Sequence, residues 1–204
     1  VTKNDRSWRR KIRLLFVGYK RNKMLCKKDR ILLRKCRIKH VKGIFAMGGF
    51  ILELKIPEYY NMTQDIDRHA ADRDKVAIRW ENERGEKRTL TYSELKDRSD
   101  ALAKGLLKSG MSKGDRIMIL LPRVPEAYIA YMAALKAGLI VLPCSEMLMP
   151  SDIRYRMEHA EVKGVIADSA LTGRVDEAAK GYSGLKLRVV RGEKSGGWEP
   201  IENL

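Results

Sequence analysis

The feature that most constrains the fold is an alternation of short apolar runs with helix-like segments through the second half of the chain. The apolar runs are RIMILLP (116–122), LIVLP (139–143), GVIAD (164–168) and LKLRVV (185–190). The segments between them have helical patterns, at 126–137, 151–160 and 175–180. Four strands that alternate with helices predict an α/β fold with a parallel sheet and right-handed crossovers.

The ends of these elements carry the residues that usually start or stop them. Pro125 stands near the first turn of its helix, where its missing N–H costs nothing, and Gly138 follows the end of that helix. The run at 116–122 is continuously apolar after Arg116, which suits a strand buried on both faces. The last fourteen residues, RGEKSGGWEPIENL, are polar and Gly-rich, and we expect a surface connection without a closing element.

Upstream of the alternation the sequence predicts a short helix, a hairpin and a longer helix. We expect the short helix to be capped at Thr63, and the hairpin to join strands 76–81 and 88–92. Ser93 is the predicted N-cap of the longer helix. One face of that helix repeats Leu95, Leu102 and Leu106 and is expected to be buried.

The net charge of +16 belongs to the N-terminal segment. Residues 1–43 contain 17 of the 42 Lys and Arg but only two of the 26 Asp and Glu, so they carry +15 and the remainder carries +1. Three interpretations stay open for the segment: an arm that binds nucleic acid or anionic lipid, a mitochondrial transit peptide, or a non-native stretch translated upstream of Met47. We favour the third and divide the chain into a basic segment, 1–46, and a domain, 47–204.

Cysteine content and hydropathy limit the compartment. Cys26, Cys36 and Cys144 form no CxxC pair and no disulfide framework, which fits a reducing compartment. The longest apolar stretch near the start, 43–52, is far shorter than the roughly 20 residues that a membrane span needs. We therefore expect a cytoplasmic protein, with the mitochondrial matrix as the alternative.

No catalytic set is visible in the residues themselves. Ligands of parallel α/β sheets gather at the carboxyl ends of strands, here the loops 121–125, 143–150 and 168–172. None contains GxGxxG or GxxxxGK[ST]. The histidines do not cluster with other metal ligands, and Cys144 is interpreted as a small core or rim residue. We predict no catalytic residue and no metal site in this chain.

Several motifs nevertheless resemble one family. TYSEL (91–95) and LKAG (135–138) occur in the order found in the N-terminal part of AMP-forming acyl-CoA synthetases, members of the adenylate-forming superfamily. LPRVPE (121–126) and SDIRYRM (151–157) are similar to the medium-chain branch. The resemblance covers about residues 58–204 and implies the N-terminal subdomain of the adenylate-forming fold, a parallel sheet flanked by helices and incomplete.

The resemblance implies a ligase reaction for the complete protein. Family members use ATP and Mg²⁺ to convert a carboxylic acid to an acyl-adenylate, then transfer the acyl group to CoA. The triphosphate loop, the Mg²⁺ ligand and the catalytic lysine lie downstream of the resembled segment. We therefore expect this chain to be a fragment without activity of its own, whose complete form takes a medium-chain or branched acid, and a complementary C-terminal chain is a possible partner.

Two residues are candidates for one wall of the CoA site, again by resemblance. Met147 matches the loop position that approaches pantetheine, and Arg156 matches the arginine that holds the nucleotide end of CoA. Each has a structural alternative: Arg156 as a solvated helix charge, and Met147 as apolar loop packing. The rival function is a basic-arm protein that binds nucleic acid or membranes on a relict α/β scaffold.

Overall fold

The computed structural model describes residues 42–47, 50–55, 59–193 and 196–204. In the first part, strand β1 (Lys42–Met47) pairs antiparallel with β2 (Phe50–Lys55). Most of the predicted basic segment, 1–46, lies outside the described residues. The division of the chain at residue 46 therefore stays a prediction.

A parallel sheet forms the centre of the fold, as the sequence predicts. Its strands stand in the order β6-β5-β7-β8-β9, and every pair is parallel. Their bounds are β5 (Arg116–Leu120), β6 (Ile140–Pro143), β7 (Val162–Asp168), β8 (Leu187–Arg191) and β9 (Glu199–Pro200). The α/β class is confirmed, with one strand more than predicted.

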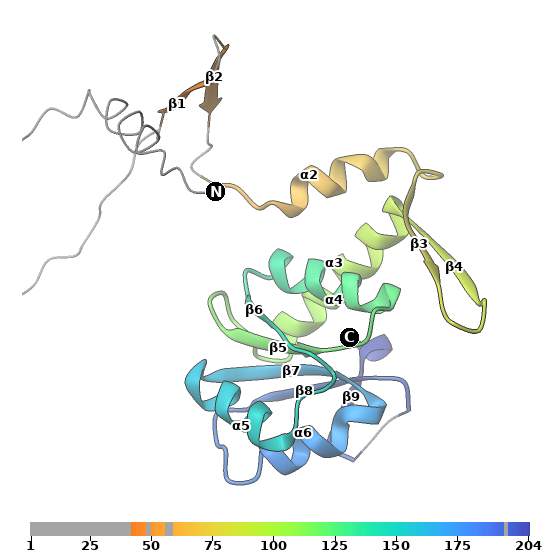
Figure 1. Cartoon of the computed structure of the whole chain (residues 1–204), viewed down its shortest axis with the longest axis vertical. Helices are drawn as coiled ribbons and strands as arrows, with labels where there is room; N and C mark the ends of the chain where they lie inside the picture. The colour runs from red at the N-terminus through yellow and green to blue at the C-terminus, as the bar shows by residue number, and fades with distance from the viewer. Residues whose placement is uncertain (1–41, 48–49, 56–58, 194–195) are drawn as a thin grey trace, which may run out of the picture. The chain divides into compact units, whose positions relative to one another are not determined.

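Two helices cover each face of the sheet (Figure 1). The bounds are α3 (Tyr92–Lys108), α4 (Pro125–Lys136), α5 (Pro150–His159) and α6 (Thr172–Ala178). Successive side chains of a strand point to opposite faces. Accordingly Ile117 and Ile119 join the core under α3 and α4, while Met118 and Leu120 join the core under α5 and α6. This double coverage explains why β5 is apolar at every position after Arg116.

The elements before the sheet confirm the predicted order of short helix, hairpin and long helix. They are α2 (Thr63–Asp67), η2 (Arg68–Ala71), β3 (Val76–Glu81) and β4 (Lys87–Thr91), the last two paired antiparallel. The prediction that Thr63 caps α2 is wrong. Thr63 is buried in the first turn, and Asn61 Oδ1 accepts hydrogen bonds from its N–H at 3.1 Å and its hydroxyl at 2.9 Å.

The predicted N-cap of the long helix is also wrong. Helix α3 begins at Tyr92, so Ser93 lies inside its first turn, and Thr91 is the cap. The Thr91 hydroxyl accepts from the backbone N–H of Glu94 at 3.2 Å, while the Glu94 carboxylate accepts from the Thr91 N–H at 2.8 Å. This reciprocal capping box satisfies two donors, whereas Ser93 has no Glu or Gln three residues later to complete one.

The C-terminal tail is part of the sheet, contrary to the expected surface connection. Trp198 is 2% exposed, and its indole N–H donates to the carboxylate of Asp176 in α6 at 3.1 Å. Strand β9 follows it and η4 (Ile201–Asn203) ends beside α3, where Leu204 contacts Gly105. A short 3-10 turn, η3 (Ser169–Leu171), precedes α6.

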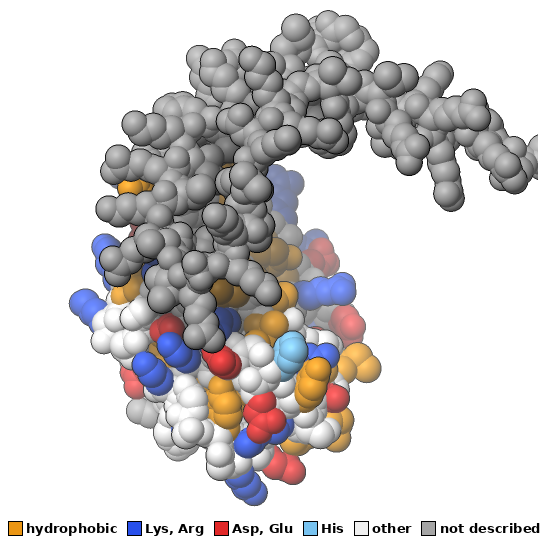
Figure 2. All heavy atoms as spheres, turned by 90° about the vertical axis from the view of Figure 1, so that its left-hand side faces the viewer, with side chains coloured by type: hydrophobic (Ala, Val, Ile, Leu, Met, Phe, Trp, Pro, Cys, Tyr) orange, Lys and Arg blue, Asp and Glu red, His pale blue; other side chains and the backbone are white. Residues whose placement is uncertain are grey.

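The surface of the described part mixes charges of both signs. Figure 2 shows Lys and Arg side chains interspersed with Asp and Glu over the face turned to the viewer. This distribution agrees with the near balance of charge after residue 43. Among the residues that the structure describes, no helix is long and apolar enough to cross a membrane.

Candidate functional site

The topology of the sheet distinguishes the carboxyl ends of two neighbouring strands. From β5 the chain goes through α4 to β6 on one side, and from β7 it goes through α6 to β8 on the other side. The neighbouring strands β5 and β7 therefore form a topological switch point, where open α/β sheets bind ligands at their carboxyl ends. The loops after these two strands, 121–124 and 168–171, border the candidate site.

A buried glutamate occupies this carboxyl end. Glu126, in the first turn of α4, is only 9% exposed, and its two carboxylate oxygens accept hydrogen bonds from Arg88 at 2.8 and 3.2 Å. Arg191 Nε lies 3.4 Å away and Arg98 Nη2 lies 3.8 Å away. Burial opposes ionisation, but the hydrogen bonds and charge of Arg88, a backbone N–H at the start of α4 and the charge of Arg191 hold the pKa of Glu126 below its ordinary value.

The same arginines connect further segments to the switch point. Arg191, at the end of β8, also donates to Asp168 at the end of β7 at 2.6 Å. Arg88 lies over the Trp80 ring at 4.5 Å, and the indole N–H of Trp80 donates to the Arg123 carbonyl at 2.6 Å. The hairpin β3–β4 and the loops after β5, β7 and β8 are thereby joined into one network of charges and hydrogen bonds.

A small cavity of about 270 Å³ adjoins this network. Its lining is apolar apart from three charged side chains, and it comprises Arg98, Ala101, Leu102, Glu126, Ile129, Ile201, Glu202 and Leu204. The volume is below the roughly 300–1,000 Å³ typical of small-molecule sites. We therefore interpret the cavity as space between α3, α4 and η4 and assign no ligand to it.

The two predicted CoA-site residues lie on the next stretch of the carboxyl end, after β6. Met147 is 83% exposed in the loop, whereas the neighbouring Leu148 packs against the core under α5 and α6. Arg156 is half-buried on α5, and its Nη1 donates to the Asp152 carbonyl of the same helix at 3.1 Å. The role of both residues in binding CoA stays a prediction.

A residue that the sequence does not single out holds this loop. Arg174 on α6 donates from Nη1 to the carbonyl oxygens of Glu146 at 3.0 Å and Leu148 at 3.4 Å. Within the loop, the Met147 N–H donates to the Ser145 hydroxyl at 3.2 Å. In the sequence Arg174 is one exposed helical arginine among many, so no pattern indicates this contact.

Cys144 lies at the rim of the core, as predicted. The residue packs partly against the core under α5 and α6, and burial raises the pKa of its thiol, an effect that the nearby charge of Arg156 offsets only in part. A raised pKa disfavours the reactive thiolate. Within the described ranges no group of three or more His, Cys, Asp or Glu side chains is arranged to hold a metal ion.

A parallel sheet covered by helices on both faces, with a topological switch point between β5 and β7, defines a doubly wound α/β domain, and sequence comparison assigns the family. Residues 66–199 match the family model described as AMP-binding enzyme. The chain therefore belongs to the AMP-binding enzyme family.

Curated relatives agree with this assignment. The chain is 37% identical over 152 residues to the uncharacterised acyl-CoA ligase YtcI of Bacillus subtilis, covering 74% of this chain and 28% of the relative. It is 30% identical over 159 residues to the human mitochondrial acyl-coenzyme A synthetase ACSM2A, with the same coverage. The chain thus spans little more than a quarter of these relatives.

Solved structures share the fold. A benzoate CoA ligase from Burkholderia xenovorans superposes with a TM-score of 0.59 at 23% identity, covering 71% of this chain and 28% of that one. The acetoacetyl-CoA synthetase from Streptomyces lividans superposes with a TM-score of 0.66 at 22% identity, covering 71% and 24%. The predicted fold, an incomplete part of the CoA-ligase architecture, is confirmed.

Proposed function

We propose that this chain is the N-terminal part of an AMP-forming acyl-CoA synthetase. Its complete form would convert a carboxylic acid, ATP and CoA to acyl-CoA, AMP and pyrophosphate. The observation that carries this proposal is the 37% identity over 152 residues to an acyl-CoA ligase. A medium-chain or branched acid is the proposed substrate, because LPRVPE (121–126) and SDIRYRM (151–157) resemble the medium-chain branch of the family.

Within this proposal the loop after β6 and helix α5 contribute to CoA binding. The guanidinium of Arg156 is partly exposed and fits a phosphate group, which arginine binds through paired N–H donors. The exposed thioether of Met147 fits the flexible, mostly apolar pantetheine arm, because methionine adapts its shape to such ligands. Arg174 would position the loop by holding two of its carbonyl groups.

ATP and Mg²⁺ do not fit the described residues. No cluster of carboxylates in the described part of the chain is arranged to hold a metal, and the described loops at the carboxyl end contain no glycine-rich phosphate-binding sequence. We propose that the nucleotide and the metal are bound by parts of the complete protein outside these 204 residues. The chain alone would then form no acyl-CoA and would need a continuing or complementary chain.

A chimera tests the proposal directly. Residues 59–204 replace the matching part of the YtcI ligase, and pyrophosphate exchange and acyl-CoA formation are measured for a series of carboxylic acids. We expect both activities to be retained. A chimera that folds like the parent ligase but exchanges no pyrophosphate with any acid that the parent accepts would contradict the proposal.

The role of Arg156 is tested in the same chimera. Arg156→Ala should raise KM for CoA about tenfold, the loss of one charge-assisted contact, and leave pyrophosphate exchange unchanged. Arg79→Ala is the matched control, because Arg79 is an exposed arginine of β3 without an ion pair among the described residues. An unchanged KM for CoA in Arg156→Ala would mean that Arg156 is only a solvated charge on its helix and does not bind CoA.

A second candidate function rests on charge alone. Residues 1–43 carry +15, enough to bind nucleic acid or an anionic membrane by counterion release. Binding that weakens steeply with salt and disappears when residues 1–43 are removed would support it. Salt-independent or absent binding would contradict it. The cytoplasmic location, with the mitochondrial matrix as alternative, stays a prediction.

A further inference from the structure

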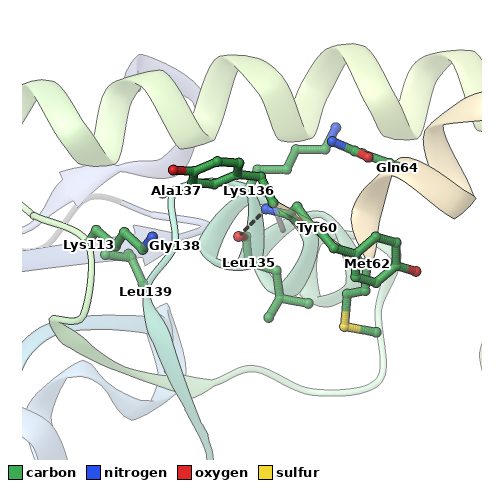
Figure 3. A pocket seen from close by; sticks show the side chains of 11 residues that line it. Tyr60, Met62, Gln64, Lys113, Leu135, Lys136, Ala137, Gly138 and Leu139 are labelled. Carbon is green, nitrogen blue, oxygen red and sulfur yellow. Dashed lines mark hydrogen bonds between the residues drawn. The ribbon is translucent and has the colours of Figure 1, made fainter. Parts of the chain in front are cut away.

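A larger cavity lies at the opposite end of the sheet from the switch point. Its volume is about 680 Å³, and it opens at the amino ends of β5 and β6 (Figure 3). Its lining comes from three segments: Tyr59, Tyr60, Asn61, Met62 and Gln64, then Lys113, and then Leu135, Lys136, Ala137, Gly138 and Leu139. This volume is within the range typical of small-molecule sites.

Hydrogen bonds preform the floor of this amino-end pocket. The Gly114 N–H donates to the Gly138 carbonyl at 2.9 Å, which joins the turn before β5 to the turn before β6. Asn61 Nδ2 donates to the Leu135 carbonyl at 3.0 Å, the bond drawn in Figure 3, and so attaches the segment before α2 to the end of α4. The pocket therefore exists before any ligand binds.

Gly138 shapes one side of the pocket. Its φ of +70° favours glycine, and a Cβ at this position would lie 3.0 Å from Cγ of Lys113. The absence of a side chain lets the aliphatic stem of Lys113 lie across the turn, as Figure 3 shows. Lys113 is thereby placed on the pocket wall instead of extending freely from its loop.

The walls of the pocket combine exposed aromatic, thioether and aliphatic side chains with the polar side chains of Asn61 and Gln64. Tyr59 is 85% exposed, Tyr60 54% and Met62 55%, and Leu135 and Leu139 line the same space. Aromatic rings and thioethers at the surface are favoured at recognition sites, because they supply a large apolar contact area with little loss of conformational entropy. The body of a fitting ligand is therefore aromatic or short aliphatic.

The charges of the pocket leave one cation without a partner. Lys136 is neutralised by Asp100 at 2.6 Å and Asp67 at 3.0 Å. Lys113, in contrast, makes no ion pair or side-chain hydrogen bond with any residue that the structure describes, and no carboxylate lines the pocket. Among the described residues that line the pocket, Lys113 is thus the cation without a carboxylate partner, while the hydroxyl of the wall residue Tyr60 donates to Asp65 outside the lining.

We propose that the amino-end pocket binds a small amphipathic monoanion. The carboxylate of an aromatic or short aliphatic acid would pair with the Lys113 ammonium, and its body would lie against Tyr59, Tyr60 and Met62. Residues 1–43 are poor occupants, because their charge of +15 repels Lys113. This site is separate from the switch point, and the proposal does not depend on the proposed ligase function.

The test uses the full chain with ¹³C-labelled methionine methyl groups, and the Met62 signal is assigned with Met62→Leu. The chain is titrated with 1-naphthoate, with octanoate, and with the neutral 1-naphthalenemethanol. We expect both acids to shift the Met62 signal and to bind at least fivefold more tightly than the alcohol. Lys113→Met should weaken the binding of 1-naphthoate about tenfold and leave that of the alcohol unchanged.

Controls separate this pocket from other cationic sites. Lys108→Met removes an exposed lysine at the end of α3, outside the pocket, and should change nothing. Arg156→Ala should also leave the binding of 1-naphthoate unchanged. The outcome of this titration is therefore distinguishable from the outcome of the CoA test of the ligase proposal. The proposal is overturned if Lys113→Met binds 1-naphthoate as tightly as the wild type does. Lys113→Gln replaces this variant if Lys113→Met folds poorly. The proposal is also overturned if the wild type binds the neutral alcohol as tightly as 1-naphthoate.

Discussion

The two ends of the parallel sheet both carry ion pairs but arrange them differently. At the carboxyl end three arginines, Arg88, Arg98 and Arg191, surround Glu126, and Arg191 also reaches Asp168. The planar guanidinium group offers several N–H donors at once, so each arginine can contact more than one segment. The carboxyl end is therefore one connected network.

At the amino end the charges are grouped in separate pairs. Arg116 pairs with Glu161 at 2.5 Å and donates to the Ala160 carbonyl at 2.7 Å. Lys163 pairs with Asp115 at 2.5 Å beside the start of β5, and Lys136 pairs with Asp67 and Asp100. Lys113 has no such partner among the described residues. An ammonium group is a compact charge on a flexible stem, and leaving one unpaired at the surface costs little.

The difference indicates a division of roles. The arginines of the carboxyl end meet at a single carboxylate, Glu126, whereas each amino-end pair joins its own segments. The amino end also has an open pocket beside Lys113. A carboxyl end held by one cluster would suit the proposed binding of ligands there, because functional groups need support from neighbouring side chains.

Removing the central carboxylate should have the largest effect on stability. Glu126→Gln leaves three guanidinium groups around a neutral, mostly buried side chain, and we expect a loss of about 3 kcal/mol in the free energy of unfolding. Urea denaturation of the full chain measures this. A loss below about 1 kcal/mol would mean that the arginines find other partners and that the network does not support the carboxyl end.

The pH dependence of stability should separate the two ends. The folded-state pKa values of Glu126 and Asp115 are both lowered, so their stabilisation is complete above the unfolded values of 4.5 and 3.8 and is lost as pH falls toward the folded values. Urea midpoints measured between pH 6 and 3 should therefore fall. In Glu126→Gln the urea midpoint should decrease less steeply than in the wild type below about pH 4.5. In Asp115→Asn the decrease should become less steep only below about pH 3.8. Identical curves for wild type and Glu126→Gln would contradict the ionised state of this glutamate.

The matched substitution at the amino end should have a smaller effect. Asp115 accepts from Lys163 and from the Ser112 N–H at 3.0 Å, and Asn can keep the second bond. Lys163 is one-third exposed and can turn to water, so Asp115→Asn should cost about 1 kcal/mol. A loss as large as that of Glu126→Gln in the same urea experiment would remove the distinction between the two ends.

The fold was largely predictable because its signals are local and periodic. The run at 116–122 predicted β5, and Pro125 and Gly138 marked the ends of α4, whose bounds are Pro125–Lys136. Strand β9 was missed because two residues give no periodicity. Trp198 holds that strand through its burial and its bond to Asp176, a contact between residues 22 apart that no local pattern records.

The site was less predictable than the fold because its contacts join residues that are far apart in the sequence. The loops at the carboxyl ends of the strands followed from the topology, but the charges that meet there come from separate elements. Arg88 lies in a hairpin and Arg191 at the end of β8, and each alone resembles a solvated charge. Only the folded chain brings them to Glu126, and only the folded chain shows that Lys113 lines the same pocket as Tyr59 and Tyr60.

The smallest expected effect concerns the loop after β6, which a single arginine from another helix holds. Arg174→Ala removes hydrogen bonds to the carbonyls of Glu146 and Leu148, and should lower the free energy of unfolding by only about 0.5–1 kcal/mol. Amide hydrogen exchange of Met147 and Leu148 should accelerate severalfold, because these contacts limit local opening. Glu177→Ala, an exposed substitution on the same helix, serves as the control and should leave exchange unchanged. If Arg174→Ala also leaves the exchange unchanged, the loop is held by its own turn and by Leu148 packing, and Arg174 does not support it.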